Sequence, residues 1–350
     1  MTDSIGFTGF GASELPPRVT ATVDFHTPGK QHGYLSVPYS SNESAWGAVR
    51  VPITVINQGR GPSILLTGGN HGDEYEGPIA LKKLARALEP EAIQGQVIVM
   101  PALNPPALQQ GLRCSPIDGV NMNRSFPGSR TGTVTQMICH YLTTHILTQV
   151  DVVVDIHAGG RTLNFVPFAA MHYLANATQF ERTFDAVTAF GAPIALVIEE
   201  LDTEGMLDGV VEAMGKVFLF TELGGGGTAS PETVEIAETG ARNVLKHFGV
   251  VEGEPVTRAE RGLPPTRMME TPDWSSYVIA DETGLFEPLI NLGDSVRVGQ
   301  PVAQIHSVEK TELQPTIYYA HRDGTLIGRH WPGLARPGDC LAVIGIDRDR

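Results

Sequence analysis

Short apolar runs alternate with segments of helical periodicity between residues 60 and 250. The runs are five to seven residues long and lie at residues 63–67, 96–100, 150–156, 194–198 and 216–221. Apolar residues at helical spacing predict helices over residues 78–88, 134–147, 180–190 and 231–248. Because strands buried on both faces are apolar throughout, this alternation predicts an α/β fold with helices on both faces of the sheet. Alternating apolar and polar residues predict further strands, at residues 19–23 and 49–56.

The pattern changes after residue 250. Residues 251–272 are rich in Glu, Arg and Pro and predict a linker. From Trp274 onward there are only short strands separated by Gly and Asp turns, and no helical pattern. We therefore expect two domains, residues 1–255 and an all-β domain over residues 273–350, which agrees with a length of 350 residues.

Composition and charge narrow the class of function. The formal net charge of -14, from 39 acidic and 25 basic residues, repels phosphate backbones and anionic lipid, so we expect no nucleic-acid or membrane partner. Residues 1–10 lack the basic start of a signal peptide, and no run approaches the roughly 18 apolar residues of a spanning helix, so we expect a cytoplasmic protein. The three cysteines form no CxxC pair, which argues against disulfides and cysteine-bound zinc.

A candidate metal site begins directly after the strand at residues 63–67. His71 and Glu74 are three residues apart, and the turn into the next helix can direct both side chains to one point. Catalytic zinc takes three such ligands and leaves one position to water. A plain surface loop would explain the pair equally well.

A third ligand is available at the end of the strand over residues 150–156. Asp155 and His157 point the same way because strand side chains alternate, and few simple explanations exist for a polar pair at the end of a buried strand. His157 could instead be a core histidine with a hydrogen-bond partner. Asp155 could orient His157 or cap a helix, and the sequence leaves its role open.

The candidate general base is Glu222, which closes an apolar strand and precedes four glycines. Loss of water around this carboxylate would raise its pKa and suit it to accepting a proton from an activated water. The glycines would let substrate and mobile backbone come close. The alternative is a glutamate that only caps the following loop.

Residues 111–128 form a long loop that contains Arg113 and Arg124. Guanidinium groups bind carboxylates through two hydrogen bonds and stabilise oxyanions. Surface ion pairing is the alternative for each arginine.

The order His71-x-x-Glu74, Asn123-Arg124, His157 and Glu222, at strand ends, resembles the zinc carboxypeptidase-like fold and, more narrowly, the succinylglutamate desuccinylase/aspartoacylase family. The resemblance implies a mixed sheet flanked by helices and a C-terminal β barrel-sandwich domain. It implies that His71, Glu74 and His157 bind one zinc ion per chain and that Glu222 is the general base.

The same resemblance implies the remaining site residues. Asn123 and Arg124 would hold the α-carboxylate of a small N-acyl amino acid substrate, and Arg113 would stabilise the oxyanion. In the aspartoacylase branch an arginine lies closer to the Asn-Arg pair, where this chain has Pro116. The implied activity is zinc-dependent hydrolysis of an amide bond, and a homodimer is compatible with it.

Residues 121–128 and the acidic composition most resemble a bacterial subgroup of this family that deacetylates N-α-acetyl-L-2,4-diaminobutyrate in ectoine breakdown. The segment 199–208 has five acidic residues and no Lys or Arg, which would favour a cationic substrate side chain. A solvated acidic loop is the alternative reading of that segment.

Three other functions remain open. Aspartoacylase or succinylglutamate desuccinylase activity, or a carboxypeptidase, would use the same metal site. A biotinyl or lipoyl carrier would need to modify Lys310, but neither Met-Lys-Met nor Asp-Lys is present. A non-catalytic zinc protein would leave Glu222 and Arg124 unexplained.

Overall fold

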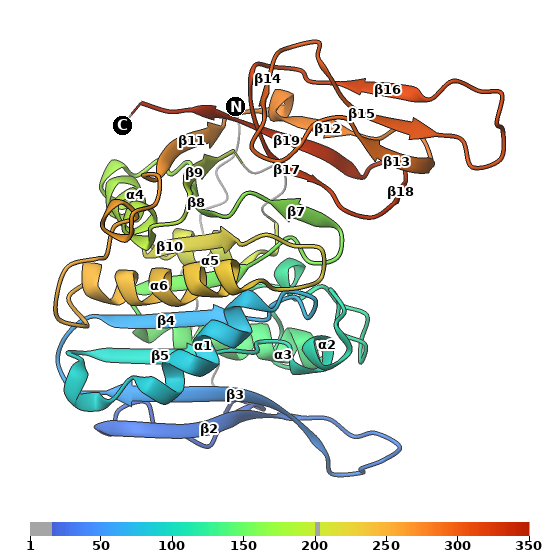
Figure 1. The fold of residues 1–350 in the computed structure, drawn as a ribbon. Coiled ribbons are helices and arrows are strands. Elements are labelled where there is room, and N and C mark those ends of the chain that lie inside the picture. Colours follow the sequence, from blue (N-terminus) through green and yellow to red (C-terminus); the bar gives the residue numbers. More distant parts are fainter. Residues whose placement is uncertain (1–15, 200–203, 350) are drawn as a thin grey trace, which may run out of the picture.

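The computed structural model describes residues 16–199 and 204–349, and its centre is a mixed sheet (Figure 1). Four neighbouring parallel strands form the middle of this sheet, in the order β5 (Gln96–Met100), β4 (Ser63–Gly68), β6 (Val152–His157) and β10 (Val217–Glu222). Antiparallel strands continue beyond β5, in the order β3 (Ala48–Asn57), β2 (Gly29–Pro38) and β1 (Thr20–Ala21). On the other side, β8 (Phe168–His172) runs antiparallel to β10 and parallel to β9 (Ile194–Ile198). The mixed sheet and the five apolar strands are therefore confirmed.

Helices cover both faces of this sheet. Ile64 and Leu66 of β4 pack in one core and Leu65 in the other, because successive side chains point to opposite faces. The first face carries α1 (Glu76–Ala87), α4 (Ala177–Phe190) and α6 (Pro231–His247). The second carries α3 (Val134–Tyr141), which continues as a π-helix over Leu142–Ile146 and a 3₁₀ turn over Leu147–Gln149, and α5 (Leu207–Ala213). Figure 1 shows α1 and α6 in front of the sheet and α3 behind it.

The structure corrects the prediction of a linker over residues 251–272. Its last residues form β11 (Arg267–Thr271), which pairs in parallel with β9 and extends the central sheet. The segment Arg267-Met-Met-Glu-Thr has little β-branched or alternating character, so only pairing with β9 reveals the strand. The short helix α2 (Pro105–Gln110) and strands β2 and β8 were also not predicted.

After β11 the chain is β structure apart from the 3₁₀ turn at Trp274–Ser276, as the sequence predicted. Strand β19 (Cys340–Asp347) pairs with β11, β12 (Tyr277–Ile279) and β17 (Gly324–His330), and β17 also pairs with β14 (Ser295–Val296) and with β7 (Leu163–Phe165). A separate sheet has the order β16 (Thr316–Tyr319), β15 (Pro301–His306), β13 (Gly284–Pro288) and β18 (Leu334–Ala335). Further 3₁₀ turns lie at Pro90–Ala92, Met122–Arg124 and Ala259–Arg261.

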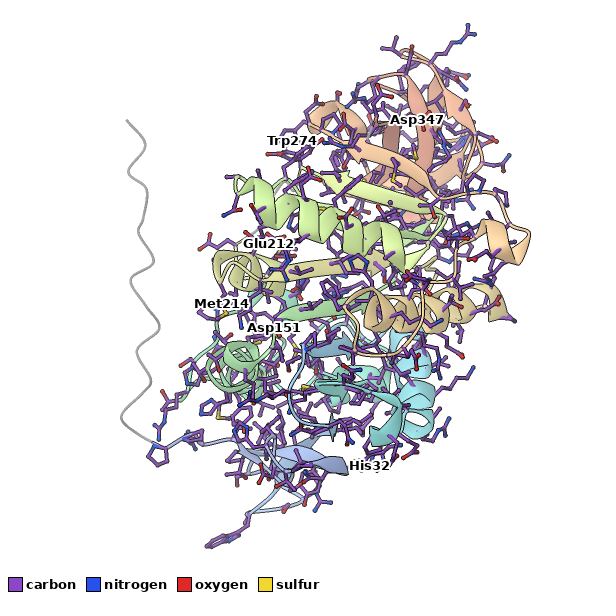
Figure 2. All side chains as sticks on the ribbon, turned by 90° about the vertical axis from the view of Figure 1, so that its left-hand side faces the viewer. His32, Asp151, Glu212, Met214, Trp274 and Asp347 are labelled. Atoms are coloured by element: carbon purple, nitrogen blue, oxygen red, sulfur yellow. The ribbon has the colours of Figure 1, made fainter. Side chains whose placement is uncertain are left out.

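The helix-covered sheet and the C-terminal β structure lie one after the other along the length of the molecule. Figure 2 shows His32 of β2 near one end of the molecule and Asp347 of β19 near the other, with Glu212 of α5 between them. Among the described residues, no helix is long and apolar enough to cross a membrane.

Candidate active site

A cavity of about 290 Å³ lies on the α5 side of the sheet, where β4, β6 and β10 end. Its polar lining includes His71, Arg113, Asn123, Arg124, His157 and Glu222. These are six of the seven residues predicted for the site, and the seventh, Glu74, contacts three of them, His71, His157 and Arg113. An open α/β sheet binds ligands beyond the carboxyl ends of its strands, which is where this cavity lies.

The local fold brings His71 and Glu74 together. Strand β4 ends at Gly68, and Glu74 precedes α1, so both residues lie in the turn between them. A Cβ on Gly72 would come within 2.0 Å of the carbonyl carbon of Ala107, so this turn requires glycine to pack against α2. His71 Nδ1 lies 2.7 Å from Glu74 Oε1, and both residues are buried.

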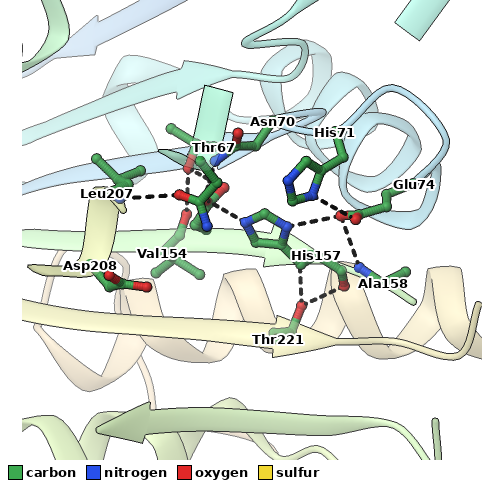
Figure 3. A network of polar contacts seen from close by, with 12 residues as sticks. Thr67, Asn70, His71, Glu74, Val154, His157, Ala158, Leu207, Asp208 and Thr221 are labelled. Atoms are coloured by element: carbon green, nitrogen blue, oxygen red, sulfur yellow. Dashed lines mark hydrogen bonds and ion pairs between the residues drawn. The ribbon is translucent and has the colours of Figure 1, made fainter. Parts of the chain in front are cut away.

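His157, the last residue of β6, completes the group. Its Nδ1 lies 2.8 Å from Glu74 Oε2, and the donor atoms of all three residues lie within 4.8 Å of one another (Figure 3). The other ring nitrogens face acceptors, since His157 Nε2 lies 2.7 Å from Asp155 Oδ2 and His71 Nε2 lies 3.2 Å from Asn121 Oδ1. These acceptors favour ring protons on Nε2, so both Nδ1 lone pairs point towards the Glu74 carboxylate. Such a set of facing acceptors needs a cation between them, and a metal ion fits it.

Asp155 has the geometry of the orienting carboxylate, one of the two roles that the sequence left open. It accepts hydrogen bonds from Thr67 Oγ1 at 2.8 Å and Asn70 Nδ2 at 3.2 Å, and its Oδ2 faces Nε2 of the His157 ring. Burial lowers the pKa of His71. Burial also opposes a charge on His157, but the facing carboxylates of Asp155 and Glu74 raise its pKa well above the usual value. The site therefore favours positive charge next to Glu74, which a proton or a metal ion can supply.

Glu222 lies beside this group. It ends β10, is in register with His157 of the neighbouring strand, and lines the cavity. The strand end is held in place because Leu223 N donates to His157 O at 3.1 Å and Thr221 Oγ1 donates to the same carbonyl at 3.0 Å. The carboxylate therefore lies at the same sheet edge as the three clustered residues.

The four glycines after Glu222 have a different role from the one predicted. All four have positive φ, and Gly224, Gly226 and Gly227 are hydrogen-bonded to the loop over residues 159–165. A Cβ on Gly226 would lie 2.7 Å from the Trp331 ring, and one on Gly225 would lie 2.0 Å from Leu163 O. Among the described residues that line the cavity, none is one of these glycines. These glycines thus let the backbone approach other parts of the protein, including Trp331, which directly follows β17.

The loop over residues 111–128 brings its polar residues to the cavity. Arg113 Nη1 lies 3.3 Å from His71 Nδ1 and 3.6 Å from Glu74 Oε1. Arg124 is exposed and donates from Nη1 to Asn123 O at 2.7 Å. Asn123 is buried, and its Oδ1 accepts from Leu207 N at 3.1 Å, which joins this loop to α5.

Sequence reasoning missed the apolar lining and one polar contact. Tyr277, Ile279, Cys340 and Val343, which we call the C-terminal wall, line the cavity from β12 and β19. No local pattern identifies them, because only long-range strand pairing brings them to the site. Asn121 was not predicted to face His71, although its position two residues before Asn123 could have suggested it.

Known proteins resemble this chain in sequence and in fold. Residues 60–248 match the model of the succinylglutamate desuccinylase/aspartoacylase catalytic domain. The chain is 49% identical, over 95% of its length and 96% of the relative, to the N-alpha-acetyl-L-2,4-diaminobutyric acid deacetylase of Halomonas elongata. Among solved structures, the product-bound ectoine utilization protein EutE (DoeB) from Ruegeria pomeroyi is 45% identical with a TM-score of 0.91, covering 95% of this chain and 99% of that one. A succinylglutamate desuccinylase from Silicibacter sp. TM1040 is 46% identical with a TM-score of 0.90, covering 95% and 100%.

Proposed function

The chain belongs to the succinylglutamate desuccinylase/aspartoacylase family, and on that premise we propose that it hydrolyses N-α-acetyl-L-2,4-diaminobutyrate to acetate and 2,4-diaminobutyrate. The observation that carries this proposal is the similarity, along almost the whole chain, to the Halomonas elongata deacetylase. The similarity to a protein of ectoine utilization supports the same substrate.

One zinc ion per chain would be held by His71, Glu74 and His157. The buried set of two imidazoles and one carboxylate, with both Nδ1 atoms turned towards Glu74, supports this assignment. When bound, zinc supplies Lewis acidity, which makes a water more acidic and polarises an amide carbonyl. Asp155 would keep the His157 ring in the orientation that ligation needs.

The chain's own residues would carry out the proton transfers and binding. The Glu222 carboxylate would accept a proton from the attacking water and deliver it to the leaving nitrogen, so that amide cleavage yields a carboxylic acid and a free amine. The Arg113 guanidinium would stabilise the negative charge that develops on the carbonyl oxygen. Arg124, with Asn123 beside it, would bind the α-carboxylate of the substrate.

Residues 1–255 and 273–350 would act as two domains, the second of the barrel-sandwich type. The C-terminal wall supports a role for the second domain in limiting the size of the cavity. A narrowed cavity favours a small acyl amino acid over a peptide chain, which weighs against a carboxypeptidase.

A second candidate is succinylglutamate desuccinylase activity, which the Silicibacter relative supports by its name. The substrate of that activity, N-succinyl-glutamate, carries a succinyl group and a side-chain carboxylate. N-α-acetyl-diaminobutyrate carries a side-chain ammonium instead. The two candidates therefore predict opposite charge preferences.

A comparison of three substrates tests the proposal. We expect kcat/KM for N-α-acetyl-diaminobutyrate to exceed the values for N-acetyl-aspartate and N-succinyl-glutamate by at least about tenfold, or about 1.4 kcal/mol. Release of free amine measures all three reactions. An equal or reversed preference would reject this substrate and leave the broader amidohydrolase assignment.

A further inference from the structure

Among the residues that the structure describes, three carboxylates line the cavity, and the proposed chemistry uses two of them. Asp155 is hydrogen-bonded to His157, Thr67 and Asn70, and Glu222 is the proposed base. We propose that the third, Asp208, determines substrate specificity by binding a side-chain ammonium group. This inference rests on the proposed function, because it assigns the partner of the substrate's distal cation.

Asp208 is buried but lies in the cavity lining, where a small ligand can reach it. It is in the first turn of α5, is only 3% exposed, and still lines the cavity. The lining of the same cavity also contains Met206, Phe218 and Phe220, which are apolar. A carboxylate in such surroundings interacts more strongly with a cation than an exposed one does, because less water screens the pair.

The position of Asp208 also suits the spacing of charges in the substrate. Leu207 N donates to Asn123 Oδ1 at 3.1 Å, and Phe126 N donates to Gly205 O at 2.9 Å. These bonds join Gly205 and the start of α5 to the loop that carries Arg124. In Figure 3, Asp208 lies on the far side of the His157 ring from Glu74. Diaminobutyrate carries its carboxylate and its distal ammonium only three carbons apart, so adjoining loops of opposite charge can bind both.

Asp208 is the residue of the acidic segment 199–208 to which we assign the binding of the substrate cation. Glu199 and Glu204 are exposed, and residues 200–203 lie outside the described residues. Within the part of the segment that the structure describes, Asp208 is the carboxylate in the cavity lining. An anionic side chain at this position would meet a like charge, which disfavours aspartate and glutamate substrates.

The test compares two substrates that differ only in charge. N-α-acetyl-L-norvaline replaces the ammonium of N-α-acetyl-diaminobutyrate by a methyl group. In Asp208→Asn we expect kcat/KM for acetyl-diaminobutyrate to fall at least 100-fold, mainly through KM, and that for acetyl-norvaline to change less than threefold. The control Glu212→Gln changes a carboxylate one turn further along α5 that pairs with His172, and it should change neither substrate more than threefold.

A binding measurement separates this inference from the proposed function. Calorimetry should show that the wild type prefers 2,4-diaminobutyrate to norvaline and that Asp208→Asn loses this preference. The wild type could show this preference, and Asp208→Asn lose it, although the wild type deacetylates neither acetylated substrate. In that case the proposed function is wrong and the role of Asp208 stands. If Asp208→Asn affects both ligands equally, or neither, the role of Asp208 is wrong even where the wild type is active.

Discussion

The cavity has a polar end, formed by His71, Asp155, His157 and Glu222 with Glu74 beside them, and a C-terminal wall from β12 and β19. At the polar end the histidines and Asp155 are at most 6% exposed and tied to one another by hydrogen bonds. In the C-terminal wall Ile279 is 38% exposed, and the side chains are largely apolar. The proposed bond cleavage belongs to the first region, and the proposed limit on ligand size belongs to the second.

This difference indicates how each region tolerates change. Removing one member of a buried polar network leaves its partners unsatisfied, whereas trimming an apolar wall mainly changes volume. We therefore expect substitutions at the polar end to reduce activity more than substitutions in the C-terminal wall do. At the contact between Gly226 and Trp331, outside the described cavity lining, we expect a loss of stability and little loss of activity.

Replacing the proposed base should have the largest effect. In Glu222→Gln, an amide cannot accept the proton of the attacking water, so kcat should fall by about 10²–10⁴-fold while fold and metal content remain. Steady-state kinetics with metal analysis measures both. Glu238→Gln, which changes a surface carboxylate paired with Lys83, serves as the control. A kcat like that of the wild type would mean that another group is the base.

Arg124→Ala should have the next largest effect. Loss of a charge-assisted hydrogen bond to the substrate's α-carboxylate should raise KM about 10- to 100-fold, with a smaller change in kcat. The rise should be absent for the matching substrate whose α-carboxylate is an amide. Arg130→Ala is the control, because that side chain binds Pro16 O outside the cavity. Equal effects on both substrates would show that Arg124 does not bind the α-carboxylate.

The contact between Gly226 and Trp331 lies outside the described cavity lining, so a change there should affect stability more than chemistry. In Gly226→Ala the new Cβ would meet the Trp331 ring at 2.7 Å. Gly215 has the same φ of +72° with nothing within 4 Å, so Gly215→Ala measures the backbone effect alone. Gly226→Ala should lower the free energy of unfolding by about 1–3 kcal/mol more than Gly215→Ala does. Equal losses in denaturant titrations would show that the packing contact is unimportant.

The two regions also differ in what the sequence could predict. His71, Glu74, His157 and Glu222 follow apolar runs, and parallel strands bring their ends to one edge of the sheet, so local pattern and family resemblance led to them. Tyr277 and Cys340 reach the cavity only because β11 pairs with both β9 and β19. Their local sequence carries no sign of that pairing. The role predicted for the glycine run was also wrong. Its contact with Trp331 joins residues far apart in the chain, which the local sequence does not reveal.

The proposed reaction requires that His71, Glu74 and His157 hold one zinc ion. Mass spectrometry of the metal content tests it most directly, with His71→Ala and His157→Ala compared with the wild type after equal exposure to zinc. We expect about one zinc per chain in the wild type and in the control His172→Ala, a buried histidine paired with Glu212, and little zinc in the two site variants. Full retention of zinc in both site variants would contradict the claim.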